Sequence, residues 1–184
     1  PNDEIAIATR VSQMPFAEST DTTAATVEAG EPRPCGDIGK TVWYRFDTFE
    51  SGGDAVSVIA TSSAFDPVIA VYEVDFSAAP SPPGALKELA CVLKPAGDVS
   101  AGHTFTTEPF TSYYVQIGGA ASTGGPLDIA LNCASGSGAS PCFFGAISVD
   151  TGEGLTHGDP APSGSSGNLV APDTGSGGYL PGAR

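Results

Sequence analysis

The segment Thr41–Thr48 reads TVWYRFDT, and its alternation decides the fold class of the chain. In an extended strand, Val42, Tyr44 and Phe46 point to one face of a sheet and Trp43 points to the other. β-Branched and aromatic residues in this order are typical of a strand that buries at least one of its faces. We therefore expect Trp43, the only tryptophan of the chain, to take part in packing.

Similar short runs, separated by Gly, Pro, Ser and Asp, recur along the chain, whereas helical periodicity is almost absent. The clearest further strands are Ala55–Ala60, Pro67–Val74, Ser112–Ile117, Leu127–Leu131 and Gly145–Val149, and the stretches Glu88–Val92 and His103–Thr107 complete a count of eight. Many short strands with turn residues between them predict an all-β domain, either a sandwich or a barrel.

The chain is strongly acidic, since 21 Asp and Glu against 7 Lys and Arg give a formal net charge of −14. Nucleic acid is excluded as a partner, because phosphate binding needs a basic face and the few cations are scattered singly. No run of about 18 apolar residues occurs, so we expect no transmembrane segment in this chain.

The acidity has two interpretations. It either keeps the protein soluble through self-repulsion or includes a calcium site, because calcium prefers clustered carboxylate and carbonyl oxygens. The spacing matches no EF-hand loop, and we predict no cofactor, with calcium as the alternative. The candidate calcium ligands are Asp3, Glu4, Asp21, Glu28 and Glu31 near the start of the chain, and Asp66, Glu73 and Asp75 further on.

Four cysteines occur, at Cys35, Cys91, Cys133 and Cys142, and none belongs to a C-x-x-C motif. An even count at wide spacing predicts two disulfides and an oxidising compartment, either extracellular or at the cell surface. Four cysteines can pair in three ways. We predict Cys35–Cys91 and Cys133–Cys142, since the second pair brackets the loop ASGSGASP and would clamp it at its base.

The composition changes near the last predicted strand, which divides the chain into a β-domain over residues 1–149 and a tail over 150–184. In the tail, 13 of 35 residues are Gly or Pro, as in a flexible linker. An ordered tail of this kind must dock on a surface, because ordering each residue costs about 1–2 kcal/mol. We expect an extended strap along its own domain or along a neighbour's sheet edge. Its apolar anchors would be Leu155, Leu169, Val170, Tyr179 and Leu180.

Catalytic patterns are missing from the sequence. Only His103 and His157 could serve as the base of a Ser-His-Asp triad, and we expect both at the surface. No G-x-S-x-G, H-E-x-x-H or P-loop motif occurs. Asp-Thr-Gly occurs at Asp150 and Asp173, too close together to come from two homologous lobes. Ala171–Gly175 resembles a sortase signal, but no apolar helix and basic tail follow it. We predict that the chain is not an enzyme.

The chain carries, in order, DTTAATVEAGEPRPCGDIGKTVWYRF, SSAFDPVIAVYE, ELAC and SYYVQIGG. Over about Asn2–Asn132 this order resembles the bacterial pre-peptidase C-terminal (PPC-like) domains, which are small secreted jelly-roll β-sandwiches. The resemblance implies a jelly-roll-like antiparallel β-sandwich, supports the Cys35–Cys91 disulfide, and implies an accessory module without an active site. Many relatives carry an Asn-Asp-Asp cluster after the second cysteine, whereas this chain reads VLKP there, which removes oxygen ligands for a cation.

Three functions fit these observations, and we favour the first. It is a structural subunit that self-associates into a filament, with the tail or the stretch Pro1–Thr26 of one copy docking on the next. The second is a module that binds a polysaccharide or another cell-surface ligand through exposed aromatics such as Phe110, Tyr113 or Tyr114. The third is an accessory domain of a secreted hydrolase.

Overall fold

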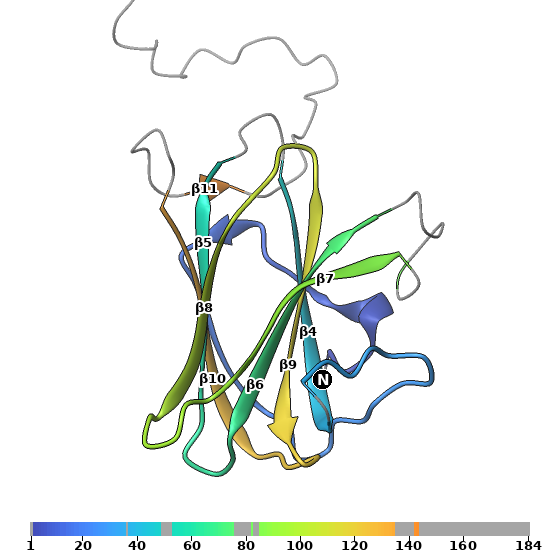
Figure 1. Ribbon diagram of the computed structural model, residues 1–184, viewed down its shortest axis with the longest axis vertical. Helices are drawn as coiled ribbons and strands as arrows, with labels where there is room; N and C mark the ends of the chain where they lie inside the picture. The colour runs from blue at the N-terminus through green and yellow to red at the C-terminus, as the bar shows by residue number, and fades with distance from the viewer. Residues whose placement is uncertain are drawn as a thin grey trace, which may run out of the picture. The chain divides into compact units, whose positions relative to one another are not determined.

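In the computed structural model, the predicted strand around Trp43 is the long strand β4, Ile38–Asp47, which lies inside a sheet (Figure 1). Val42, Tyr44 and Phe46 point to the interior between two sheets, and Trp43 points to the opposite face. Both faces of β4 are buried, which explains why its apolar and aromatic residues occupy even and odd positions alike.

The structure describes residues 2–35, 37–48, 53–75, 82, 85–134 and 142–143. The chain divides into two units, and every described residue belongs to the first, Pro1–Ile147. The predicted strand Gly145–Val149, the predicted tail over 150–184 and the residue His157 lie outside the described residues. The same holds for the predicted anchors Leu155, Leu169, Val170, Tyr179 and Leu180.

The described strands form two large sheets. One has the order β1-β4-β9-β6-β7, the second has the order β3-β10-β5-β8, and β2 and β11 form a small ribbon. The bounds are β1 Thr9–Arg10, β2 Gln13–Met14, β3 Phe16–Asp21, β5 Ala55–Thr61, β6 Pro67–Val74, β7 Leu86–Leu93, β8 Ser100–Thr106, β9 Ser112–Ala120, β10 Pro126–Ala134 and β11 Cys142–Phe143, with a short 3-10 helix η1 at Ile5–Ile7. We call the two large sheets sheet 1 and sheet 2.

The connectivity is that of a jelly roll. Counted along the chain, the eight strands from β3 to β10 are arranged 2-7-4-5 in sheet 1 and 1-8-3-6 in sheet 2. All pairs among these eight strands are antiparallel, and only β1 adds to β4 in parallel. Interleaving of consecutive strands between two sheets is the double Greek key of the jelly roll. The fold is therefore the all-β, jelly-roll-like sandwich expected from the sequence.

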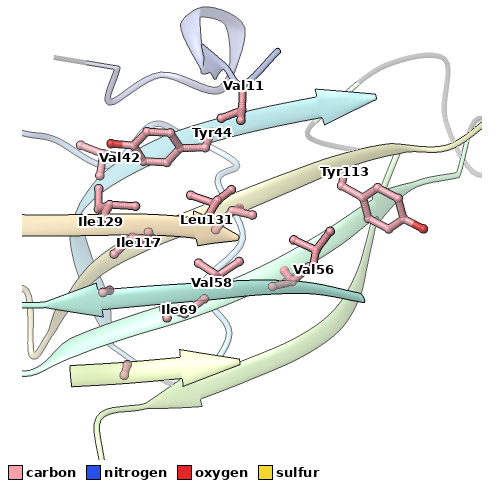
Figure 2. Packing of buried hydrophobic residues seen from close by; sticks show 14 of the residues in the cluster. Val11, Val42, Tyr44, Val56, Val58, Ile69, Tyr113, Ile117, Ile129 and Leu131 are labelled. Atoms are coloured by element: carbon pink, nitrogen blue, oxygen red, sulfur yellow. The ribbon is translucent and has the colours of Figure 1, made fainter. Parts of the chain in front are cut away.

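The core lies between the inner faces of the two sheets (Figure 2). Both sheets contribute apolar side chains. Those of sheet 1 include Val42, Tyr44 and Phe46 of β4 and Tyr113, Val115 and Ile117 of β9, and those of sheet 2 include Val56, Val58, Ile129 and Leu131. Inside this core the ring of Tyr113 stacks on that of Phe46, with 5.2 Å between centroids, and contacts the tilted ring of Phe105 at 5.4 Å. This apolar burial is the main favourable term in holding the sheets together.

The outer faces of the two sheets differ. On the outer face of sheet 1, the N-terminal segment with Ile5 covers a second apolar cluster that includes Trp43, Tyr72 and Tyr114. The disulfide Cys35–Cys91, with 5.9 Å between its Cα atoms, ties the loop before β4 to β7 at this face. The outer face of sheet 2 is not covered by any described element. Among the described residues, only the outer face of sheet 1 is therefore covered by another segment of the chain.

Phe16–Asp21, part of the N-terminal stretch proposed for exchange between copies, forms β3 and pairs with β10 of its own chain. Cys133 is disulfide-bonded, whereas the side chain of Cys142 lies outside the described residues. The pairing Cys133–Cys142 therefore stays a prediction.

Candidate functional site

A buried carboxylate organises the covered outer face of sheet 1. Glu31 is only 7% exposed, and its Oε1 accepts hydrogen bonds from Thr41 Oγ1, from Trp43 Nε1 at 3.1 Å and from Gln116 Nε2 at 2.8 Å. Its Oε2 accepts the backbone N–H of Glu28 at 2.7 Å. Four donors satisfy this carboxylate, so its role is to fasten the loop before β4 onto the sheet.

The network extends to Tyr72 on β6. The Tyr72 hydroxyl donates to Gln116 Oε1 at 2.8 Å. Burial raises the pKa of Tyr72 above that of a free tyrosine, and the nearby charges of Glu88 and Glu31 raise it further. Burial likewise raises the pKa of Tyr44 and of Tyr113, both on the inner face of sheet 1. These phenols stay neutral in the folded protein and pack inside it, and the hydroxyls of Tyr72 and Tyr113 also take part in hydrogen bonds.

The acids proposed as calcium ligands mostly hold the fold together. Asp3 accepts from the backbone N–H and hydroxyl of Thr26, and Glu28 accepts the backbone N–H of Ile5. Asp21 accepts the backbone N–H of Thr23. Ion pairs join Asp66 to Lys94 at 3.2 Å and Glu73 to Lys87 at 2.6 Å. The described residues contain no group of three or more His, Cys, Asp or Glu side chains that could hold a metal ion. Calcium binding stays a prediction.

His103 lies within β8, where its ring stacks on that of Phe105 with 6.2 Å between centroids. It is half-buried, and it lies in a strand, as the predicted strand His103–Thr107 implied. No hydrogen bond joins it to a serine, an aspartate or a glutamate among the described residues. The described part of the chain therefore holds no triad around this histidine.

Two of the three aromatics proposed as binding platforms are buried. Tyr113 is 1% exposed because it lies between the sheets, and Tyr114 is 6% exposed because the N-terminal segment covers it. The expectation that either residue is exposed is therefore wrong. Neighbouring residues of a strand point to opposite faces, and both faces of β9 are buried. Phe110, by contrast, is 74% exposed.

Phe110 lies in the loop 107–111 between β8 and β9, at one end of the sandwich (Figure 1). Its φ is +52°, a left-handed backbone conformation that bulky residues rarely adopt. The loop is fixed on both sides of Phe110. Thr48 Oγ1 donates to the carbonyl oxygen of Glu108 at 2.6 Å and accepts the backbone N–H of Thr111 at 2.9 Å. Tyr113 Oη accepts the backbone N–H of Glu108 at 2.7 Å.

Strand β8 is the last strand of sheet 2 among the described residues. The backbone N–H of Thr107 donates to the carbonyl oxygen of Asp54, which fixes the phase of the hydrogen bonds between β8 and β5. Because paired groups alternate in antiparallel strands, the N–H and C=O groups of Gly102, Thr104 and Thr106 face away from β5. These groups form a free edge with respect to the described strands.

A shallow groove of 320 Å³ lies on the uncovered outer face of sheet 2. Ile59, 38% exposed, is the largest exposed apolar side chain that lines it. Ser19 Oγ donates to Asp128 Oδ1 across the neighbouring strands β3 and β10. The other residues of this outer face that line the groove are Ala17, Thr61 and Ala130. We call this feature the Ile59 groove.

No helix among the described residues has the length and apolar character needed to cross a bilayer. No protein-family model matches the chain, and no curated protein does either.

Among solved structures, the pre-peptidase C-terminal domain of a collagenase from Bacillus anthracis is 13% identical, with a TM-score of 0.43, and the match covers 68% of this chain and 94% of that domain. PliG, a periplasmic inhibitor of g-type lysozyme from Aeromonas hydrophila, is 14% identical, with a TM-score of 0.39 over 68% and 95% of the two chains. CorA, a surface-associated copper-binding protein of Methylomicrobium album, is 10% identical, with a TM-score of 0.45 over 68% and 96%. The first of these is a domain of the family that the sequence resembles.

Proposed function

We propose that this chain is a non-catalytic extracellular structural subunit that assembles at the cell surface, into a filament formed by strand or tail exchange between copies. The observation that supports the proposal best is the free edge of β8. Its seven residues, Ser100–Thr106, include no proline, no acid and no lysine or arginine. An edge of this kind is a template for a further strand, because unpaired N–H and C=O groups can accept another backbone.

The other edges of the two sheets carry features that oppose strand addition. Glu18 on β3 points inward, and its Oε2 is buried without a hydrogen-bond partner among the described residues. Strand β7 presents the exposed charges of Lys87 and Glu88, and β1 has only two residues. Inward-pointing charges, surface charges and short strands are the usual means of blunting an edge. The contrast with β8 favours β8 as the acceptor edge.

The donor in this proposal is the tail over 150–184. Strand addition gains main-chain hydrogen bonds whatever the side chains are, so a segment rich in Gly and Ser is tolerated. Leu169 and Val170 stand in the longest stretch of the tail without proline or charge, residues 163–171. A tail that leaves one copy and pairs with the next makes a head-to-tail contact, which produces an open filament if the rotation does not close.

An extracellular setting and a non-catalytic role belong to the same proposal. The disulfide Cys35–Cys91 is typical of proteins from oxidising compartments. Glu31 and Tyr72 are engaged in hydrogen bonds inside the fold, and the ring of His103 packs on Phe105. A module that works by contact needs no group with a catalytic pKa.

The test uses the full chain at increasing concentration, followed by sedimentation velocity and negative-stain microscopy. Thr104→Pro removes a backbone N–H from the free edge without touching the bonds to β5. Thr104→Val keeps that N–H and serves as the matched control. We expect filaments for the parent and for Thr104→Val, and monomers for Thr104→Pro. A parent chain that stays monomeric, or equal assembly of both variants, would contradict the proposal.

The tail is tested separately by the double change Leu169→Asp with Val170→Asp. Two charges in the proposed donor segment should lower assembly without changing the melting temperature of the sandwich. Assembly that persists in this variant would remove the tail as donor and leave only direct strand pairing between copies.

A second function is favoured by the exposure of Phe110. In this alternative the chain is a polysaccharide- or surface-binding accessory module of a secreted hydrolase, with Phe110 as a stacking platform. Co-sedimentation with insoluble polysaccharides tests it, with Phe110→Ser as the variant. Binding that is lost in Phe110→Ser would favour the alternative, and equal binding by both proteins would refute the role of Phe110.

A further inference from the structure

Phe110 has three properties that rarely coincide. Its side chain is largely exposed, its backbone is held in the left-handed region, and the loop around it is fixed by hydrogen bonds to Thr48 and Tyr113. Strained backbone persists only where the surrounding structure enforces it, and it is concentrated at binding and switch sites. The strained backbone at Phe110 therefore lowers the stability of the fold while its ring is held in solvent.

The shape of this site favours a knob over a platform. Tyr113 and Tyr114, the neighbouring aromatics in sequence, are both buried, so the ring of Phe110 stands without a second exposed aromatic beside it in the loop 107–111. Sugar-binding surfaces use rings together with precisely placed polar groups. The hydroxyl of Thr111 donates instead to the carbonyl of Pro109 within the same loop. A rigid ring at a loop tip fits an apolar hollow of a protein, where aromatic anchors contribute most of the binding energy.

A hollow of suitable size exists on the same molecule. The Ile59 groove has a volume of 320 Å³, and an apolar cavity of roughly 150 Å³ is enough to bind benzene. Ile59, Ala17 and Ala130 form the apolar part of its lining. The Asp128 carboxylate, which also lines the groove, accepts a hydrogen bond from Ser19 Oγ.

Phe110 cannot reach the groove of its own copy. The loop 107–111 follows the Asp54 end of β5, through the bond from Thr107 N–H to Asp54 C=O. The groove is lined by Ile59 and Thr61 at the opposite end of β5. Thr61 lies seven positions after Asp54 along the strand, which corresponds to roughly 23 Å. The knob and the groove therefore belong to opposite ends of one strand.

We propose that Phe110 of one copy inserts into the Ile59 groove of a second copy. This inference rests on the proposed function, since it supplies a second contact between subunits of the same assembly. A knob that fits a hollow elsewhere on the same surface gives a heterologous contact, and heterologous contacts propagate into open arrays. The tip Pro109–Thr111 carries no charge, which suits self-association in a chain with a net charge of −14.

The charges around both partners predict a salt effect. Glu108 precedes the tip, and Asp128 lines the groove, so the contact brings these two carboxylates toward one another. Salt screens such repulsion. Association through this contact should therefore become tighter, and not weaker, when the ionic strength is raised from 20 mM to 300 mM.

The direct test places p-benzoyl-phenylalanine at position 110 in the full chain and irradiates an equal mixture of ¹⁴N and ¹⁵N protein. Mass spectrometry then distinguishes links between copies from links within one copy. We expect mixed-isotope links from position 110 to Ala17, Ile59 or Ala130. Links that stay within one copy, links that reach other residues, or no links in a chain that assembles would overturn the contact while leaving the proposed function in place.

Two variants measure the contribution of the contact. Phe110→Ser and Ile59→Asp should each weaken association at least about tenfold, as expected for loss of an anchor residue. Val99→Ser is the matched control, because Val99 is an equally exposed apolar residue, 73% exposed, outside both surfaces. Equal association of all three variants and the parent would refute the contact. A parent that is monomeric at every concentration refutes the proposed function together with this inference.

Discussion

Glu31 is the residue whose replacement tests the architecture most severely. Its carboxylate joins the loop before β4 to Thr41, Trp43 and Gln116 on the outer face of sheet 1. We consider Glu31→Ala, which removes all four acceptor contacts at once, and Glu31→Gln, which keeps one side-chain oxygen in a group of nearly the same shape.

The free-energy cost of Glu31→Ala depends on which of the four donors to Glu31 have a second acceptor. Thr41 Oγ1 also bonds to Thr26 C=O, and Gln116 Nε2 also bonds to Pro32 C=O. Trp43 Nε1 and the backbone N–H of Glu28 have Glu31 as the acceptor and would lose it. A buried donor without a partner costs about 1–3 kcal/mol, so Glu31→Ala should cost about 2–6 kcal/mol. That is a large share of the roughly 5–15 kcal/mol that stabilises a typical domain.

Glu31→Gln should cost less. Its side-chain oxygen can still accept from Trp43 Nε1, but its amide N–H₂ would meet the N–H of Glu28, and one donor would lose its partner. The expected cost is about 1–3 kcal/mol. The difference between the two variants therefore reports the network itself, because both remove the same negative charge.

Urea unfolding followed by tryptophan fluorescence measures these costs, with Trp43 as the only tryptophan and a direct partner of Glu31. With an m-value of about 2 kcal/mol/M, a loss of 4 kcal/mol moves the midpoint by about 2 M. Glu108→Ala, at an exposed acid, is the control and should change stability by less than about 0.5 kcal/mol. Equal costs for Glu31→Ala and Glu31→Gln, or a cost below about 1 kcal/mol for Glu31→Ala, would refute this reasoning.

Three further outcomes are expected. Phe110→Gly should raise the unfolding free energy by about 0.5–1 kcal/mol, because glycine adopts positive φ without strain; a decrease in thermal stability would speak against strain at this position. Because the pKa of three tyrosines is raised in the fold, their contribution to stability should be constant below pH 10 and fall above it, by about 1.4 kcal/mol per pH unit for each phenol that ionises only on unfolding; absorbance at 295 nm that titrates near pH 10 without unfolding would contradict this. Replacing Cys35 and Cys91 by Ala should cost about 4 kcal/mol for a loop of 56 residues; a urea midpoint unchanged from the parent would disagree.

The sequence predicted most strands of the two sheets, but not the segments that cover them. The alternation predicted correctly that Val42, Tyr44 and Phe46 share one face of β4, because period-two patterns report directly on side-chain direction. Strand β3, Phe16–Asp21, was not recognised, since an edge strand with an inward Glu18 lacks a clean apolar alternation.

The exposure of the two faces of β9 could not be predicted from the sequence of that strand either. Alternation shows only that Tyr113 and Tyr114 point to opposite faces. Whether the second face is covered depends on the N-terminal segment around Ile5, more than 100 positions away in the sequence. The left-handed backbone at Phe110 and the acceptor role of Glu31 likewise arise from contacts with Thr48 and Trp43, which no local pattern encodes.

Assembly at the free edge of β8 is tested most directly by hydrogen exchange of individual backbone amides at low and high protein concentration. The N–H groups of Gly102, Thr104 and Thr106 face away from β5, so they should exchange rapidly in the dilute monomer. If a strand from another copy pairs with this edge, the same three amides should become protected in the concentrated protein, while those of Ala101 and His103 change little. Rapid exchange of all three at every concentration, in samples where particles form, would contradict strand addition at β8.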